Sequence, residues 1–282
     1  MKTYLALLEK ILIEGAESKD RTGTGTSSLF SESLKFDLQE GFPLVTTKFV
    51  NYKAVLAELL WFVQGFTNIS MLDSQIWNEW ATERGSVGPM YGSQWRNWLG
   101  KPCIWENEIY YEIIDQLADV IKNIQSNPFS RRHVVTAWNP TYLPKENISP
   151  QQNVLDGNMA LAPCHKDFQF YVRNGELSLH WNQRSVDVFL GLPFNIASYA
   201  TLLIMVSNLC NLKPKILSFH GVDVHLYNNH RIQATTQILR KPKSLSKLIV
   251  NPAVKDINSY TTKDFALENY LHHEKLSGKI SI

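Results

Sequence analysis

The spacing of hydrophobic residues predicts several helices in this chain. The first opens the chain, where Tyr4, Leu5, Leu8, Ile11 and Leu12 fall on one helical stripe. The same three- or four-residue spacing recurs over residues 50–66, 112–125, 193–209 and, more briefly, 229–239. We therefore expect four long helices and one short one.

Alternating or continuous apolar runs predict strands at residues 28–36, 134–138, 168–172 and 215–224. Asn174 and Gly175 follow the third run, and Asn-Gly between alternating runs is a strong hairpin signal. Residues 176–182 are therefore expected to return antiparallel. The polar stretch 140–157 predicts a surface loop, and the residues beyond Pro242 predict short strands and loops.

These elements are interspersed without a strict βα alternation, which favours an α+β fold over a doubly wound sheet. We expect a mixed, twisted sheet flanked by helices. No repeat, low-complexity tract or linker divides the chain, so a single domain should span residues 1–282. Hydrophobic residues make up 44% and charged residues 19%, as is typical of a soluble globular protein.

Charge and cysteine content argue against several classes of function. The net charge of +2 predicts no nucleic-acid-coating surface, and the basic residues 241–247 fit a solvated loop. Three scattered cysteines suit neither a disulfide framework nor a zinc site. His225 and His230 come nearest to metal-ligand spacing, but ordinary helix-surface positions explain them, so we expect no metal. We see no signal peptide or membrane span, and expect a soluble cytoplasmic protein.

Cys164, in Ala162-Pro-Cys-His165, is the candidate nucleophile. A free cysteine is most often a small buried hydrophobic residue. Arg184, however, follows just past the predicted hairpin and could lie near the sulfur. A nearby cation lowers the pKa of a thiol and favours the reactive thiolate. Arg184 could equally hold a phosphate or be a solvated surface residue.

Three more arginines are candidate anion ligands. Arg21 lies in a glycine-rich segment, and Arg131 and Arg132 follow a turn at residues 127–130. Four arginines, counting Arg184, in a chain of near-zero net charge predict a focused phosphate site rather than a diffuse polyanion surface.

Other residues suggest a flat heterocyclic ligand. Asn195 either caps a helix or reads the amide edge of a heterocycle, because it offers a donor and an acceptor together. Glu58 lies on or beside a buried helix face, so it is either partly exposed or a functional acid. Trp77 and Trp80, three apart on a predicted helical turn, either pack in the core or wall a flat ligand.

Eight ordered motifs resemble the thymidylate synthase family, and the chain is identified as a member on that basis. They lie at residues 20–26, 42–48, 58–62, 88–92, 130–132, 162–165, 183–199 and 225–230, within a resemblance that runs from residue 4 to residue 282. The resemblance implies a thymidylate synthase-like fold whose sheets pack back to back in a homodimer.

The same resemblance implies a covalent reaction between dUMP and 5,10-methylenetetrahydrofolate. Cys164 attacks C6 of the uracil, and C5 then attacks the one-carbon unit. After the C5 proton is lost, the folate leaves and returns a hydride, which gives dTMP and dihydrofolate. The carboxyl-terminal tail closes over the site and excludes water.

The resemblance also implies roles for individual residues. Asp187 is counted with the catalytic, nucleotide and folate residues, since it binds the pterin within the active site. The other catalytic residues are Cys164, Glu58 for proton transfer at O4, Tyr91 for the C5 proton, Arg184 and Asn195. The nucleotide residues are Arg21, Arg184 and Ser185 at the phosphate, Arg131 and Arg132 from a second subunit, Gln183, Asn195 at the uracil edge, and His225 and Tyr227 at the deoxyribose. The folate residues are Asn51, Ile76, Trp77, Trp80, Leu190, Gly191, Phe194 and Ser281.

Four departures from the family pattern gather around the cofactor and the tail. They are Asn51 in place of histidine, Asn182 in place of tyrosine, the polar pair at residues 166–167, and the ending at residues 279–282. A related viral enzyme type lets water capture the exocyclic methylene, so hydroxymethyl-dUMP and tetrahydrofolate are the alternative products. Asn195 argues against a cytidylate-specific relative, which has aspartate there. Residues 183–202 also resemble phage enzymes, and a viral origin would place the protein in a host cytoplasm.

A third interpretation is an inactive relative that binds a nucleotide or RNA. It is not favoured, because binding alone needs no nucleophile and Cys164 occurs here with Glu58 and Arg184. Dependence on nucleic acid is not expected.

Overall fold

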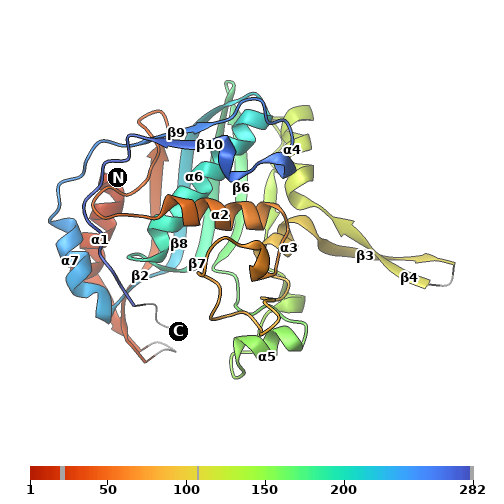
Figure 1. Cartoon of the computed structure of the whole chain (residues 1–282), viewed down its shortest axis with the longest axis horizontal. Coiled ribbons are helices and arrows are strands. Elements are labelled where there is room, and N and C mark those ends of the chain that lie inside the picture. The colour runs from red at the N-terminus through yellow and green to blue at the C-terminus, as the bar shows by residue number, and fades with distance from the viewer. Residues whose placement is uncertain (20–22, 107, 280–282) are drawn as a thin grey trace.

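The computed structural model describes residues 1–19, 23–106 and 108–279 (Figure 1). The longer helices are α1 (Lys2–Glu14), α2 (Tyr52–Val63), α4 (Gln116–Ser126), α6 (Gly191–Leu209) and α7 (Arg231–Ile238), and the shorter ones are α3 (Tyr91–Arg96) and α5 (Pro150–Leu155). Short 3-10 turns lie at Ile69–Met71, Pro140–Tyr142, Asn228–His230, Ile257–Ser259 and Thr262–Asp264.

The central sheet has the strand order β1-β2-β8-β7-β6-β5. Its strands are β1 (Ala16–Ser18), β2 (Thr26–Asp37), β5 (Val134–Thr136), β6 (His165–Arg173), β7 (Glu176–Asp187) and β8 (Lys213–Tyr227), and two smaller ribbons are β3 (Trp98–Trp105) with β4 (Glu108–Ile114) and β9 (Lys247–Val250) with β10 (Phe265–Glu268). β7 and β8 run parallel, whereas the other neighbours in the central sheet are antiparallel. The predicted α+β class with a mixed sheet is therefore confirmed.

The predicted hairpin joins β6 to β7. Asn174 and Gly175 have positive φ angles of 52° and 72°, and Arg173 pairs with Glu176 across the turn. Positive φ at both central positions matches the twist of a two-residue hairpin. Both strands continue beyond the predicted runs, and their extensions carry residues of the candidate site.

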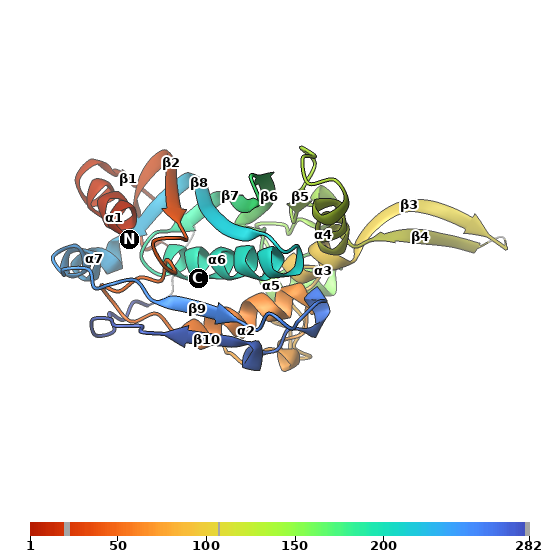
Figure 2. The ribbon, with the colours of Figure 1, turned by 90° about the horizontal axis from the view of Figure 1, so that it is seen from above.

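α6 is the centre of the core, with the sheet on one side and α2 on the other (Figure 2). Buried residues lie all around the helix between Leu192 and Ser207. Among the described residues, α6 is the helix long and apolar enough to cross a membrane, yet most of it is covered by the rest of the protein. A helix that is hydrophobic on every side is expected in such a buried position.

The predicted start of the helix at residues 112–125 is wrong. Glu112 belongs to β4, and α4 begins only at Gln116. Asp115 sets this boundary, because its side chain accepts a hydrogen bond of 3.0 Å from the Ala118 N–H and so caps the helix.

The stretch 140–157 is also more than the surface loop that its polarity predicts. It contains α5, which Ser149 caps and Pro150 begins. Asn153 is buried, and its side chain bonds the N–H of Lys145 at 2.8 Å and the carbonyl at 2.9 Å. The segment is therefore folded onto itself by one internal amide.

The ribbon of β3 and β4 projects from the body as an arm (Figures 1 and 2), which the sequence pattern did not predict. The pairing of its strands places apolar side chains on one face. These are Leu99, Pro102, Ile104, Ile109, Tyr111 and Ile113. The other face also carries apolar side chains, among them Trp105 and Ile114, and there the Tyr110 hydroxyl donates to Glu108 at 2.8 Å.

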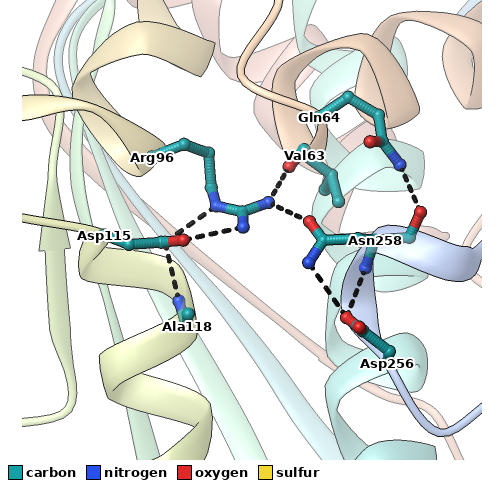
Figure 3. Close-up of polar contacts among 7 residues, drawn as sticks. All are labelled: Val63, Gln64, Arg96, Asp115, Ala118, Asp256 and Asn258. Atoms are coloured by element: carbon teal, nitrogen blue, oxygen red, sulfur yellow. Dashed lines mark hydrogen bonds and ion pairs between the residues drawn. The ribbon is translucent and has the colours of Figure 1, made fainter.

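Arg96, at the end of α3, fixes the base of the arm to the body (Figure 3). Its Nε and Nη2 donate to the two carboxylate oxygens of Asp115, at 2.7 Å each. Its Nη1 donates to the carbonyl of Val63 at the end of α2 and, at 2.8 Å, to Oδ1 of Asn258. One guanidinium, on a side chain that is 10% exposed, thus ties α2, α3, α4 and the C-terminal segment together.

Replacement of Arg96 by methionine is expected to lower the free energy of unfolding by about 3 kcal/mol, because Asp115 and the Val63 carbonyl lose their cationic donor. Urea unfolding followed by tryptophan fluorescence measures the loss. Lys10→Met is the control: Lys10 pairs with Glu32 at 2.6 Å but its side chain is 42% exposed. Its loss should be much smaller than that of the Arg96 variant, because solvent screens an exposed ion pair. Equal losses in the two variants would contradict the structural role of Arg96.

Candidate active site

A cavity of about 630 Å³ is lined by residues of α2, α3, β6, β7, α6 and β8 and of the loops beside them. Most of the predicted site residues line it, although they come from segments far apart in the sequence. They are Glu58, Ile76, Trp77, Trp80, Tyr91, Cys164, Gln183, Arg184, Ser185, Asp187, Leu190, Gly191, Phe194, Asn195, His225 and Tyr227.

The remaining predicted residues lie elsewhere. Asn51 does not line the cavity; it caps α2 by accepting a hydrogen bond of 3.4 Å from Ala54. Arg131 and Arg132 are exposed between α4 and β5, away from the cavity of their own chain. The predicted residues Arg21 and Ser281 lie outside the described residues.

Cys164 is held at the cavity by two neighbours. Its N–H donates to the Tyr91 hydroxyl and its carbonyl accepts from the Arg184 N–H, both at 2.9 Å. The Arg184 side chain donates to the carbonyls of Pro163 at 3.1 Å and Ala162 at 2.8 Å, and its Nη2 lies 3.9 Å from the Cys164 sulfur. The predicted proximity is confirmed, although Arg184 lies within β7 rather than past the return strand.

The predicted direction of the pKa shift at Cys164 is wrong. Burial raises the pKa of this thiol above its ordinary value. The positive charge of Arg184 opposes the shift, and the negative charge of Asp223 adds to it. Desolvation therefore outweighs the cation here, and the neutral thiol is favoured over the thiolate.

Glu58 is half-buried at the cavity wall, and its pKa is that of a perturbed acid, the functional alternative from the sequence. Burial raises its pKa to about 7, against the opposing effect of the Trp77 indole, which donates to Oε1 at 2.8 Å. A carboxyl group that titrates near neutrality can both give and take a proton. The ring centroids of Trp77 and Trp80 are 5.6 Å apart. The two residues lie in one turn, in which the Trp80 N–H donates to the Trp77 carbonyl at 3.2 Å.

Asn195 lies in the second turn of α6 and is not its cap. The Gln183 side chain donates to its Oδ1 at 3.2 Å, and Oε1 of Gln183 accepts from the Trp181 indole at 2.9 Å. These bonds fix the Asn195 amide at the cavity wall, an arrangement that suits contact with the edge of a heterocycle.

Two titratable residues near the cavity were not predicted. His165 lines the cavity, with its Nδ1 3.3 Å from the Tyr199 hydroxyl, and burial lowers its pKa to about 4. Lys48 is buried, and burial lowers its pKa to about 7. Its ammonium donates to the Phe189 carbonyl and lies 3.6 Å from the centre of the Phe189 ring. Both lie in motifs that the sequence singled out, but nothing in those motifs marks them as buried.

Asp187 orders the turn from β7 into α6. Its Oδ1 accepts from the N–H groups of Phe189 at 2.8 Å and Leu190 at 3.2 Å. Its Oδ2 lies 3.9 Å from Nδ1 of His230. The helix-surface position expected for His230 is wrong, because this side chain is completely buried in a 3-10 turn.

His225 does not lie on a helix surface either; it faces the cavity from β8. Its Nδ1 lies 3.7 Å from the carboxylate of Asp223. Burial acts to lower the pKa of His225, but the nearby carboxylates of Asp223 and Asp187 outweigh burial, so the pKa is raised. Within the described part of the chain, no group of three or more metal-binding side chains is gathered in one place.

A thiol, a cation and an acid with a pKa near neutrality line one cavity, and enzymes that use a nucleophilic cysteine bring such groups together. A family model described as thymidylate synthase matches residues 2–282. The chain belongs to the thymidylate synthase family and is a methyltransferase of that family.

Curated relatives agree with this assignment. A protein named thymidylate synthase from Francisella tularensis subsp. holarctica is 49% identical over 285 residues and is covered completely, as is this chain. One of the same name from Francisella philomiragia subsp. philomiragia is 47% identical over the same length, again with full coverage of both. These relatives do not favour the hydroxymethylase alternative.

Glu58→Gln is expected to stabilise the protein at alkaline pH but not in acid. Burial raises the pKa of Glu58 from 4.5 to about 7, so the folded state loses stability as pH rises through that interval. Glutamine removes this penalty, and the gain in melting temperature should therefore grow from about pH 4.5 to about pH 7. Scanning calorimetry across this range measures it. A gain in melting temperature that is independent of pH would contradict the raised pKa of Glu58.

Proposed function

We propose that this chain makes dTMP by reductive methylation of dUMP, with 5,10-methylenetetrahydrofolate as the source of the one-carbon unit and the hydride. The observation that carries the proposal is the 3.9 Å contact between Arg184 and the Cys164 sulfur inside the cavity. A cavity of about 630 Å³ falls in the range of small-molecule sites. Residues 1–282 act as one catalytic domain in the cytoplasm.

The nucleotide occupies the part of the cavity formed by β7, β8 and the start of α6. Arg184 lies beside the sulfur, where its charge suits the dUMP phosphate. The fixed amide of Asn195 suits the uracil edge, and the donor at His225 suits the deoxyribose hydroxyl. The full set is Arg21, Gln183, Arg184, Ser185, Asp187, Asn195, His225 and Tyr227.

The reaction begins when the Cys164 sulfur adds to C6, which makes C5 nucleophilic. Arg184 favours loss of the thiol proton, against the effect of burial. C5 bonds to the one-carbon unit, Tyr91 helps to remove the C5 proton, and Glu58 moves protons at O4 through water. Tetrahydrofolate then leaves and returns a hydride to the exocyclic carbon as Cys164 departs, which balances as dTMP and dihydrofolate.

The folate occupies the other part of the cavity. Its pterin bonds to Oδ2 of Asp187. The N–H groups of Phe189 and Leu190 both donate to Oδ1, which leaves Oδ2 for a ligand. Flat, apolar walls suit a pterin and its neighbouring ring. They comprise Ile76, Trp77, Trp80, Leu190, Gly191 and Phe194. Asn51 and Ser281 complete the proposed set of folate residues, and the carboxyl-terminal tail closes over the site.

The active form is a homodimer whose sheets pack back to back. Supporting this, α6 and α2 lie on one side of the sheet (Figure 2), and alternate residues of β7 point to the other side. Asn182 is on that other side, where its side chain donates to Asp167 at 2.6 Å. Two residues that depart from the family pattern, Asn182 and Asp167, are thus bonded to each other.

Arg131 and Arg132 of each subunit reach the dUMP phosphate in the partner's cavity.

Cys164→Ser is expected to lower turnover at least about 10³-fold, because the hydroxyl is a much weaker nucleophile, while dUMP affinity is kept. Dihydrofolate absorbance measures turnover, and calorimetry measures dUMP binding. Cys210→Ser, at the far end of α6, is the control and should keep full activity. A wild-type reaction that consumes dUMP without forming dihydrofolate would contradict methyl transfer.

Subunit mixing tests the shared arginines. A double variant Arg131→Glu with Arg132→Glu and the variant Cys164→Ser should each be inactive as homodimers. Equal mixing should restore about a quarter of wild-type activity, since half of the dimers are hybrids with one intact site. Activity measured before and after refolding of the mixture decides this. No recovery, although hybrid dimers form, would place the arginines in their own subunit's site.

A further inference from the structure

His230 lies between two parts of the proposed folate site, the carboxyl-terminal tail and Asp187. The side chain is completely buried in the 3-10 turn Asn228–His230. Its Nε2 lies 2.9 Å from the carbonyl oxygen of Lys279, and its Nδ1 lies 3.9 Å from Oδ2 of Asp187. One imidazole ring therefore contacts the tail at one edge and approaches a cavity carboxylate at the other.

The partners of His230 fix the placement of its proton. A carbonyl oxygen can only accept, so Nε2 carries the proton and donates it to Lys279. In the neutral ring Nδ1 is then an acceptor, and among the described residues it has no hydrogen-bond partner. It faces Oδ2 of Asp187, the oxygen that the backbone N–H groups of Phe189 and Leu190 leave for a ligand.

The tail is packed closely against the same ring. A Cβ atom on Gly278 would lie 2.6 Å from Nε2 of His230 and 3.2 Å from a ring carbon of Phe189. The rings of His230 and Phe189 are themselves 5.2 Å apart. Glycine at 278 is what allows the tail backbone to reach the Nε2–H of His230.

We infer that His230 is a positioning residue for the folate co-substrate. Its Nε2–H holds the tail at Lys279, and its Nδ1 edge limits where Oδ2 of Asp187 can point. The closed tail and the pterin-binding carboxylate are thereby set by one side chain. This inference rests on the proposed function, because it takes Asp187 and the tail as parts of the folate site.

Two amide substitutions separate the contact of His230 with the tail from its approach to Asp187. The side-chain amide of asparagine reproduces the position of Nδ1, and that of glutamine reproduces the position of Nε2. His230→Asn loses the bond to the tail, so the KM for methylenetetrahydrofolate should rise about tenfold while the KM for dUMP is unchanged. His230→Gln can still donate to Lys279 and should return the folate KM toward the wild-type value.

Tail closure is measured in the complex of 5-fluoro-dUMP with methylenetetrahydrofolate. This complex is trapped because C5 carries fluorine in place of the hydrogen that is normally removed as a proton, and fluorine cannot leave as a cation. Carboxypeptidase trimming, followed by mass spectrometry, reports how long the tail stays closed. His230→Asn should be trimmed about tenfold faster than wild type, and His230→Gln at nearly the wild-type rate.

Gly278→Ala crowds the ring without removing it, and should raise the folate KM and the trimming rate as His230→Asn does. The control is His273→Asn, since Nε2 of His273 also lies 2.9 Å from a backbone carbonyl, that of Lys241, in the same C-terminal segment. It should leave both quantities unchanged. Melting temperatures check that every variant is folded.

Wild-type values for the folate KM and trimming in both His230→Asn and Gly278→Ala would overturn the inference and leave the proposed function standing. An equal rise in the dUMP and folate KM would also overturn it, as the mark of a general structural defect. If wild type forms no trapped complex, the proposed function fails and the inference fails with it.

Discussion

The burial of α6 is the constraint on which the rest of the structure depends. A helix that is apolar on every side must be covered on every side, and here the sheet covers one side and α2 the other. This packing brings Glu58 on α2, Asn195 on α6 and Arg184 on β7 to one cavity. It also leaves the other side of the sheet for a second subunit, so that the proposed dimer and the site arise from the same core.

Burial favours the uncharged forms of several groups around the cavity. The pKa values of Cys164 and Glu58 are raised, and those of Lys48 and His165 are lowered, with desolvation as the leading cause in each. The Arg184 guanidinium supplies a positive charge there, 3.9 Å from the Cys164 sulfur. Surroundings of low dielectric constant strengthen each remaining electrostatic contact with a charged substrate.

The hydrophobic pattern predicted the core helices and the hairpin because each depends on local spacing. It missed the arm, whose strands are exposed on both faces and lack the alternation of a half-buried sheet. In the site, motif order predicted which residues meet, including Cys164 and Arg184. The pKa of the thiol was predicted wrongly, because burial depends on segments such as α2 and β8 that no local pattern reveals. Likewise, the bond between Asp167 and Asn182 joins two departures that looked unrelated in the sequence.

The arm leaves and re-enters the body at one place, since Trp98 pairs with Ile114 at its base, next to the Arg96–Asp115 ion pair. Its length can therefore change without altering the distance between its two anchors. The ribbon is for this reason a place where relatives can gain or lose residues at little energetic penalty. It is equally a site where a fluorophore, or a linker to a solid support, can be attached outside the catalytic cavity.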